Sequence, residues 1–395
     1  MATITINSPF GEFLDNGITT RKDLFEVDGN TSLGFGYNIQ NSEDHKYIFI
    51  GNQTQAAILN ILIKQSDGSY SNVILSSTST PSLSSGEGRF FTISPDGKRL
   101  YTSWSRSTGS TVYEYETLDG TWTDTTKTEL YAISFHCLSL SYKEFYDDVD
   151  LIDRRTLILG QTYTSTASTN RIQPKLLSAT YDDVFANDWV WVTNNDSWSV
   201  QNSSSVVSLS DNGNWLFSCG TANAPSADWE FTIWDRRSDR SAGSGGMGSI
   251  AIDGGTLKNL TTSVTRSYKA CHSEFISDNC VIVSFPYYGG ISGLESTTNY
   301  CSLYSIETYD DWTTYSVHEI IEPNEGNDYI PFAYHDYDIL GTSTQPYHPA
   351  KTFAIEDNRI SCLVRYKADW SQVGYPLKYK TYVRTYSSTS LSAIS

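Results

Sequence analysis

The chain of 395 residues carries 45 acidic and 27 basic side chains, which gives a formal charge of −18 at neutral pH. A field of this sign repels phosphate backbones and anionic membrane surfaces, so we expect no nucleic-acid partner and no membrane insertion. No apolar run is long enough to cross a bilayer, and the alternating start Met1–Ile6 lacks the basic and apolar regions of a signal peptide.

The composition favours strands over helices. Tyr occurs 27 times and Trp 10 times, whereas Met occurs only twice. Aromatic side chains suit pleated surfaces, and no long stretch repeats its apolar residues at helical spacing. We therefore predict an all-β protein.

A unit of apolar strand, polar turn and second apolar strand recurs along the chain. In its sharpest copy, Ile93 is followed by the turn Ser94-Pro95-Asp96-Gly97 and the apolar stretch that includes Leu100. The turn aspartates that we assign to the copies are Asp44, Asp96, Asp153, Asp211, Asp278 and Asp357. Multi-strand units of this size, repeated along a chain, predict a β-propeller.

A second turn follows in each unit and opens the next strand with an aromatic residue. Asp67 follows Asp44 at the same distance at which Asp119 follows Asp96. The aromatic residues after these and the later second turns are Tyr70, Trp122, Trp189 and Trp312. Because these residues recur at matching positions, we assign most of the Trp side chains to packing.

The repeats predict a single β-propeller domain over residues 1–395, with six four-stranded blades and long inserted loops. A seventh blade would have to lie in 319–350, whose prolines make it look like a long loop. The segment 1–39 is expected to supply a strand that closes the ring with the C-terminal blade, because pairing the two ends removes open sheet edges.

One strand carries a more specific resemblance. The stretch Phe231–Asp235 ends in the pair Trp234-Asp235 and resembles the third strand of WD40 propeller repeats. Ser94–Tyr101 resembles the repeat of many bacterial and phage propellers. These resemblances imply a propeller fold, which hosts many unrelated functions. The Gly-His pair of the WD40 family is absent, so its His-Asp network does not carry over.

Candidate binding residues lie in the segments that interrupt the repeat. Ser238–Gly255 is rich in Gly and Ser and is interpreted as an exposed insertion between blades. Pro286–Thr298 is interpreted as a loop, and the Pro-rich 319–350 stretch holds two histidines. Aromatic residues outside the matching turns offer flat faces for a glycan or a protein. The candidates are Tyr287, Tyr288, Trp198, Trp229, Trp370, His335 and His348.

One acidic cluster could hold a metal. Asp147, Asp148 and Asp150 offer oxygen ligands at a spacing that Ca²⁺ could use. The calcium-loop pattern is missing and Arg154 and Arg155 lie beside the cluster, so solvated turn carboxylates are the favoured interpretation. We expect no other cofactor.

The sequence assigns no catalytic residue. No nucleophile elbow occurs between a strand and a helix, and among 45 acidic side chains a glycosidase pair cannot be singled out. We therefore expect a non-enzymatic structural or recognition module of a larger assembly, most simply a bacteriophage virion (tail, nozzle or capsid decoration). Its expected partners are other subunits, including copies of itself. The alternatives are a glycoside hydrolase or a glycan-binding lectin that uses the propeller face, and a cytoplasmic or secreted protein without a recognisable signal peptide.

Overall fold

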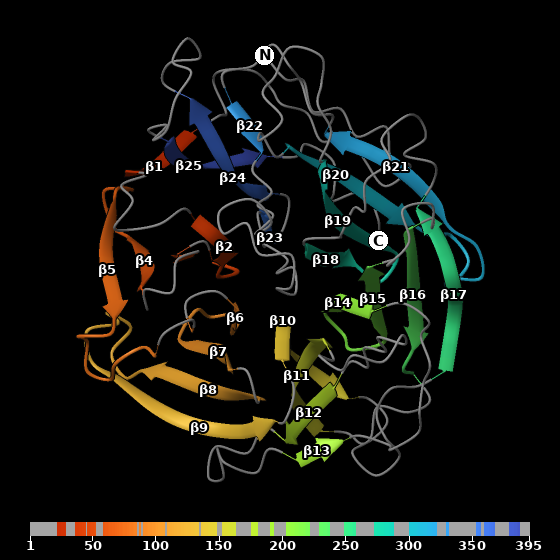
Figure 1. Cartoon of the computed structure of the whole chain (residues 1–395), viewed down its shortest axis with the longest axis horizontal. Coiled ribbons are helices and arrows are strands. Elements are labelled where there is room, and N and C mark those ends of the chain that lie inside the picture. Colours follow the sequence, from red (N-terminus) through yellow and green to blue (C-terminus); the bar gives the residue numbers. More distant parts are fainter. Residues whose placement is uncertain are drawn as a thin grey trace.

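The computed structural model describes residues 22–28, 36–44, 46–52, 58–84, 87, 90–106, 109–133, 136–147, 152–162, 175–180, 190–192, 203–221, 229–237, 249–257, 272–287, 300–321, 329–331, 353–356, 359–367 and 379–387. Over these residues the chain forms antiparallel β-sheets placed around a central axis, which is a β-propeller (Figure 1). The all-β propeller fold that the repeat predicted is confirmed. Within these ranges, no helix is long and apolar enough to cross a membrane.

Four consecutive strands make one sheet, and the first of the four lies nearest the axis (Figure 1). Five sheets of the described chain follow this plan. Sheet 1 holds β2 (Gly36–Asn41), β3 (Tyr47–Asn52), β4 (Ile58–Lys64) and β5 (Tyr70–Ser76). Sheet 2 holds β6 (Phe90–Ile93), β7 (Arg99–Arg106), β8 (Gly109–Thr117) and β9 (Thr125–Ile133). Sheet 3 holds β10 (His136–Asp147), β11 (Ile152–Thr162), β12 (Lys175–Thr180) and β13 (Val190–Val192). Sheet 4 holds β14 (Ser203–Leu209), β15 (Trp215–Thr221), β16 (Trp229–Asp235) and β17 (Ser249–Leu257). Sheet 5 holds β18 (His272–Ser277), β19 (Cys280–Tyr287), β20 (Tyr300–Glu307) and β21 (Ser316–Ile321).

A further sheet, sheet 6, joins strands from both ends of the described chain. In it β24 (Arg359–Lys367) pairs with β25 (Tyr379–Ser387), and β25 pairs with β1 (Lys22–Asp28). On its other side β24 pairs with β22 (Tyr329–Pro331) and β23 (Phe353–Glu356). The described parts of the stretch that was expected to be a long loop, 319–350, therefore belong to strands of sheets 5 and 6.

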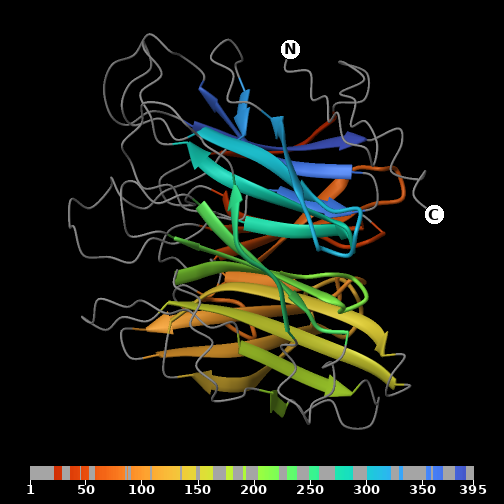
Figure 2. The same cartoon turned by 90° about the vertical axis from the view of Figure 1, so that its right-hand side faces the viewer.

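Neighbouring sheets pack face to face through aromatic and aliphatic side chains, and Figure 2 shows them stacked when the ring is seen from the side. Between sheets 1 and 2 the rings of Phe49 and Trp122 meet edge to face at 5.2 Å. Between sheets 4 and 5 the rings of Trp215 and Trp312 lie 6.5 Å apart. All three Trp side chains are buried. Their assignment to packing is confirmed, and each such aromatic pair adds about 1 kcal/mol beyond the area it buries.

The first turn of a sheet, which links its first and second strands, is held by a serine and a carboxylate or amide. In sheet 1 the Ser42 hydroxyl donates to Asp44 Oδ1 at 2.6 Å and accepts the Tyr47 N–H at 3.0 Å. The Lys46 N–H donates to the same Asp44 oxygen at 2.9 Å. The equivalent bonds recur around Ser94 with Asp96, and around Ser210 with Asn212.

Two of the turn aspartates that the sequence suggested were misplaced. In sheet 4 the position of Asp44 is occupied by Asn212, because Ser210 sets the register of the turn, and Asp211 is the residue between them. In sheet 3 Asp153 lies inside β11 and pairs with Tyr146, so it is a strand residue. The interpretation of Asp153 as a turn residue is therefore wrong, whereas Asp211 does lie in a turn and was only aligned one position away from the residue that matches Asp44.

A buried side chain that follows the third strand closes the first turn of the same sheet in three cases. Each donates to a backbone carbonyl of that turn and so ties the end of the third strand to it. The donors and acceptors are Trp122 Nε1 to Gly97 at 3.2 Å, Trp312 Nε1 to Asp278 at 2.8 Å and Arg236 Nη1 to Gly213 at 2.9 Å.

Two predicted loops are shorter than expected. The Gly-rich segment Ser238–Gly255 was taken as an insertion between blades, but its end from Ser249 onward is β17, the outer strand of sheet 4. The pairing of β16 with β17 shifts register near Ile233, and glycines in a strand accommodate such irregularities. Likewise, Pro286 and Tyr287 continue β19 rather than opening a loop.

Candidate functional site

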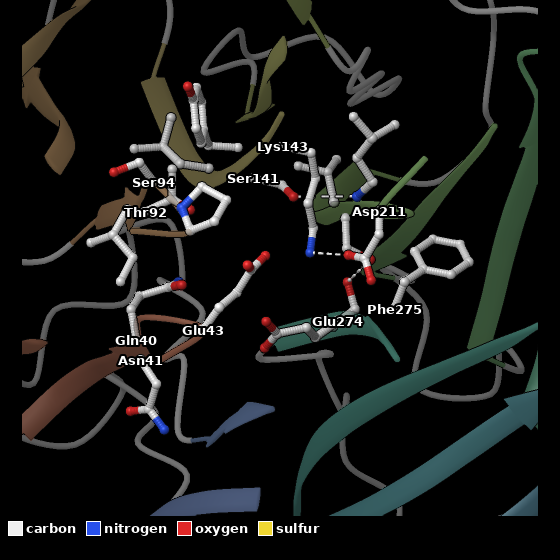
Figure 3. Close-up of a pocket in the computed structure, with 18 of the residues that line it drawn as sticks. Gln40, Asn41, Glu43, Thr92, Ser94, Ser141, Lys143, Asp211, Glu274 and Phe275 are labelled. Atoms are coloured by element: carbon white, nitrogen blue, oxygen red, sulfur yellow. Dashed lines mark hydrogen bonds and ion pairs between the residues drawn. The ribbon is translucent and has the colours of Figure 1, made fainter. Parts of the chain in front are cut away.

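A cavity of about 200 Å³, which we call the central cavity, lies between the first strands of sheets 1 to 5. Each of β2, β6, β10, β14 and β18 contributes residues to its wall, so the cavity sits on the axis of the ring (Figures 1 and 3). The first turns of three sheets contribute residues to the wall as well. The cavity therefore belongs to the end of the ring that carries these turns, which we call the turn end.

The fold brings these residues together because the first strands of the sheets run in the same direction along the axis of the ring. Each first strand pairs in antiparallel fashion with the second strand of its sheet, so equivalent residues of different sheets reach the same depth. Four polar wall residues share one register, which is defined by the second-strand partner of each: Gln40 with Phe49, Thr92 with Tyr101, Ser208 with Phe217 and Glu274 with Ile282.

The mouth of the cavity carries charges from the first turns. The residue after the turn serine lines the cavity in three sheets, and it is Glu43, Pro95 or Asp211. The Glu43 N–H donates to the Pro95 carbonyl at 2.8 Å, which ties the turns of sheets 1 and 2 together. Asp211 is exposed and forms an ion pair with Lys143 of β10. Figure 3 shows Glu43, Lys143 and Glu274 reaching toward the same space.

Hydroxyl groups line the deeper wall and also join the sheets. The Ser141 hydroxyl of β10 accepts the Leu209 N–H of β14 at 3.2 Å. The buried Ser273 hydroxyl of β18 donates to Ser208 Oγ at 3.0 Å. These bonds fix the spacing of three neighbouring first strands, so the wall is pre-formed.

Gln40 has a buried donor that nothing in the described part of the protein satisfies. Its side chain is 6% exposed, and its Nε2 has no hydrogen-bond partner among the described residues. Figure 3 shows the amide directed into the cavity. An unpaired buried donor costs folding free energy, and this atom is itself shielded from solvent by its neighbours.

The chemistry that this arrangement supports is polar recognition. Among the described wall residues, three carboxylates (Glu43, Asp211 and Glu274) and one ammonium group (Lys143) surround the cavity, together with Ser and Thr hydroxyls and the Gln40 side chain. Such a wall can bond hydroxyl groups and can balance a positive charge. Over the described residues, no group of three or more His, Cys, Asp or Glu side chains is placed to hold a metal ion.

A second polar cluster lies between sheets 2 and 3 and borders the cavity through Tyr142. The rings of Tyr101 and Tyr142 stack at 4.3 Å, and the Tyr142 hydroxyl donates to Glu144 at 2.5 Å. Burial raises the pKa of the nearby Glu114 carboxyl, which the neighbouring Tyr101 hydroxyl and the charge of Arg155 partly offset. The cluster is buried between two sheets, so we assign it to packing.

Three of the residues that the sequence suggested for binding lie at strand ends of the described chain. Tyr287 ends β19, Trp229 begins β16 and Asp147 ends β10. The others lie outside the described residues: Tyr288, Trp198, Trp370, His335, His348, Asp148 and Asp150. The roles proposed for them, including a Ca²⁺ site, stay predictions.

The cavity residues could not be identified from the sequence, because each residue type is common and none of them is part of a recognisable motif. A signal was nevertheless present, since Glu43 and Asp211 each follow the serine of a first turn. With the turns aligned on serine instead of aspartate, these residues fall at one position. Gln40 and Glu274 would then align through the strands that precede the turns.

No family model and no curated protein matches this sequence. Among solved structures, the chain is similar to the WD40 repeats of RRP9, with 9% identity, a TM-score of 0.43, and 94% of this chain and 98% of that chain covered. It is also similar to the β-propeller domain of the trilobed protease from Pyrococcus furiosus, with 9% identity, a TM-score of 0.39, and 91% and 98% covered. A third similarity is to hydrazine synthase of Kuenenia stuttgartiensis, with 12% identity, a TM-score of 0.45, and 84% and 77% covered. At these identities, the likeness concerns the fold and says nothing about activity.

Proposed function

We propose that this β-propeller is a non-enzymatic structural or recognition module of a larger assembly, most simply of a bacteriophage virion. Its partners are then other subunits of the particle, including copies of the same chain. The proposal is supported by the lengths of the connections between strands, which differ between the two ends of the ring. Connections far from the packed strands can vary without cost to the core, and they make natural docking surfaces.

At the turn end, the first turns between described strands are short, as in 42–46, 94–98, 210–214 and 278–279. The connections that lead to the opposite end are longer, and include 163–174, 258–271, 288–299 and 368–378. Two turn-end connections, 181–189 and 238–248, have comparable length. Most of the extra chain therefore leaves the ring at the end opposite the turns, and this observation carries the proposal.

We also infer that residues 1–395 form one domain whose ring has six blades. The pairing of β1 with β25 supports this inference, because it makes a strand from the N-terminal part the outer strand of sheet 6. The pairing of β22 with β24 supports it too, because the described residues of 319–350 then belong to strands of sheets 5 and 6 and not to a seventh blade. An experimental density map of the ring counts its blades directly.

The test of the assembly role is a determination of native mass, both for the purified chain and for the particle that contains it. A fixed symmetric multimer, or a stoichiometric place in a virion, is the expected result. A chain that stays monomeric at high concentration and co-purifies with no subunit overturns the proposal.

The second candidate is a glycan-binding lectin or a glycoside hydrolase that uses the central cavity. The observation that favours it is the presence of Glu43, Asp211 and Glu274 in one polar wall, since glycoside hydrolysis uses paired carboxylates. Turnover of a glycan panel that is lost in E43Q or E274Q would replace the first proposal with the hydrolase. Retained binding without turnover would identify a lectin.

A further inference from the structure

We propose that the outer edge of β5 is a self-association surface, at which a second copy of this chain adds its own β5 as an antiparallel strand. This contact rests on the assembly role proposed above and names the surface through which copies meet. Three features support it: backbone groups that point outward, the absence of charge, and side chains that complement each other across a two-fold axis.

β5 is the outer strand of sheet 1, and among the described strands it pairs only with β4 (Figure 1). In the turn before β5, the Gln65 N–H donates to the Ser69 carbonyl at 2.7 Å. Hydrogen-bonded and non-bonded pairs alternate in an antiparallel ladder, so every second residue from Ser71 onward turns its backbone groups to β4. The residues whose backbone groups point outward are therefore Tyr70, Asn72, Ile74 and Ser76.

The loop after β5 agrees with this direction and covers one end of the edge. The Ser76 N–H donates to Ser79 Oγ at 2.8 Å, and the Ser79 hydroxyl donates to the Ile74 carbonyl at 3.3 Å. The Leu83 N–H donates to the Ser76 carbonyl at 2.9 Å. The N–H groups of Asn72 and Ile74 have no backbone partner among the described residues. A further strand can therefore pair with residues 70–74.

The charge pattern selects a second copy as the partner. No charged residue occurs between Asp67 and Glu87, so β5 and the loop after it are neutral. The outer strands β9, β17, β21 and β1 each carry at least one charged side chain, which is a common device against edge pairing. Two copies with a formal charge of −18 repel each other, and the repulsion is smallest where a neutral strand meets a neutral strand. A basic partner would find no carboxylate on this strand.

The side chains of β5 complement each other in one register. A two-fold axis through Asn72 places Asn72 opposite the partner's Asn72, and Tyr70 opposite the partner's Ile74. The Ile74 side chain is 48% exposed, and an aromatic ring opposite a β-branched side chain is a favourable cross-strand pair. In this register the Asn72 and Ile74 N–H groups of each copy can donate to carbonyls of the other.

The register is tested by oxidative cross-linking of N72C on the full chain. Directly opposite Cα atoms in a hydrogen-bonded antiparallel pair lie about 5.5 Å apart, a separation that a disulfide spans. We expect a covalent dimer on a non-reducing gel, with peptide mapping that finds position 72 linked to position 72. The matched control is T126C, which places a thiol at an exposed position of the outer strand β9. Cross-linking of N72C that does not exceed that of T126C overturns the proposal.

The strength of the contact is tested by sedimentation equilibrium over a range of concentrations. N72K brings two like charges opposite each other at the axis, and I74K replaces the exposed apolar side chain with a charge. We expect each variant to raise the dissociation constant of the dimer at least about tenfold, whereas T126K leaves it unchanged. Thermal unfolding should be the same for all three, because each substituted side chain is exposed. Equal dissociation constants for N72K, I74K and T126K overturn the proposal.

These outcomes separate the β5 contact from the assembly role. A multimer that persists unchanged in N72K and I74K would overturn the contact and leave the assembly role in place. A two-fold dimer that is lost in N72K, from a chain that co-purifies with no particle subunit, would support the contact and remove the virion role.

Discussion

At the scale of single residues, two turn glycines share a left-handed backbone but differ in their surroundings. Gly97 has φ of +67°, and a Cβ added there would lie 2.5 Å from Cδ2 of Tyr47 in the neighbouring sheet. Gly68 has φ of +81°, and a Cβ there would meet nothing within 4 Å. The first glycine therefore serves both backbone conformation and close packing, and the second serves conformation alone.

We expect Gly97→Ala to lower the free energy of unfolding by about 2–4 kcal/mol, since it adds a steric clash to the backbone strain of about 1–2 kcal/mol. Gly68→Ala should cost only the backbone part. Chemical denaturation of both variants measures the difference. Equal losses would mean that Tyr47 moves aside and that the inter-sheet contact at this turn is loose.

Two lysines form ion pairs whose carboxylate partners differ in burial. Lys127 bonds the carboxylate of Glu87 at 3.0 and 3.1 Å, and the Glu87 side chain is fully buried. Lys143 pairs with Asp211, whose side chain is 67% exposed. A charge left in water costs little, whereas a charge left buried lacks its compensation.

Lys127→Met is accordingly expected to destabilise the protein by about 2–3 kcal/mol, because Glu87 would retain only its bonds to Tyr115 and Ser84. Lys143→Met should change the free energy of unfolding by less than about 1 kcal/mol. Thermal unfolding of the two variants tests this ordering, and the reverse ordering would contradict it.

At the scale of the element, the second turns, which link third and fourth strands, hold their carboxylates in the charged form. The pKa of Asp67 is lowered first by the hydrogen bond from the Ser69 hydroxyl and then by that from its N–H. Backbone and hydroxyl bonds from Thr121 and Thr314 likewise lower the pKa values of Asp119 and Asp310. The same local device thus recurs in three sheets.

Because these pKa values are lower in the folded state than in the unfolded chain, the turns stabilise the fold above the unfolded value near 3.9. That contribution is lost as the pH falls through the folded pKa values. The triple variant D67N/D119N/D310N should show a flatter decline of the free energy of unfolding below about pH 4. Urea titrations from pH 6 to pH 2 measure the slope. An unchanged slope would assign acid unfolding to other carboxylates.

At the scale of the whole molecule, the pairing of β1 with β25 joins the two ends of the described chain. Register runs from Lys22 opposite Thr385 to Asp28 opposite Lys380. Without β1, the outer edge of β25 would present unpaired backbone groups, which invite pairing with other chains.

Removal of residues 1–28 is therefore expected to cost several kcal/mol, at about 1 kcal/mol for each lost backbone bond, and to promote association. Removal of residues 388–395, which follow β25, is the control. Equilibrium unfolding and light scattering report the two effects. A truncated chain as stable and as dispersed as the control would show that the ring does not need β1.

The turns show how much of the fold could be predicted. The bonds of Ser42 span two to five residues, so the pattern is local and can be recognised in the sequence. The role of Arg236 was not predictable, because it replaces a Trp as the donor to a turn carbonyl and shares no chemical likeness with it. The turn register in sheet 4 was predicted wrongly for a related reason, because the Asn212 side chain can accept the same hydrogen bonds as an Asp side chain.

Apolar alternation and hydrogen bonding within turns are short-range properties, so the all-β class, the propeller repeat and the packing role of Trp122 and Trp312 could be predicted from the amino-acid order. The candidate site could not, because it exists only in the assembled ring. Gln40, Lys143 and Glu274 come from separate sheets, and they meet because the first strands of those sheets converge on one axis. Convergence of this kind is a long-range property of the closed ring, which no single repeat contains.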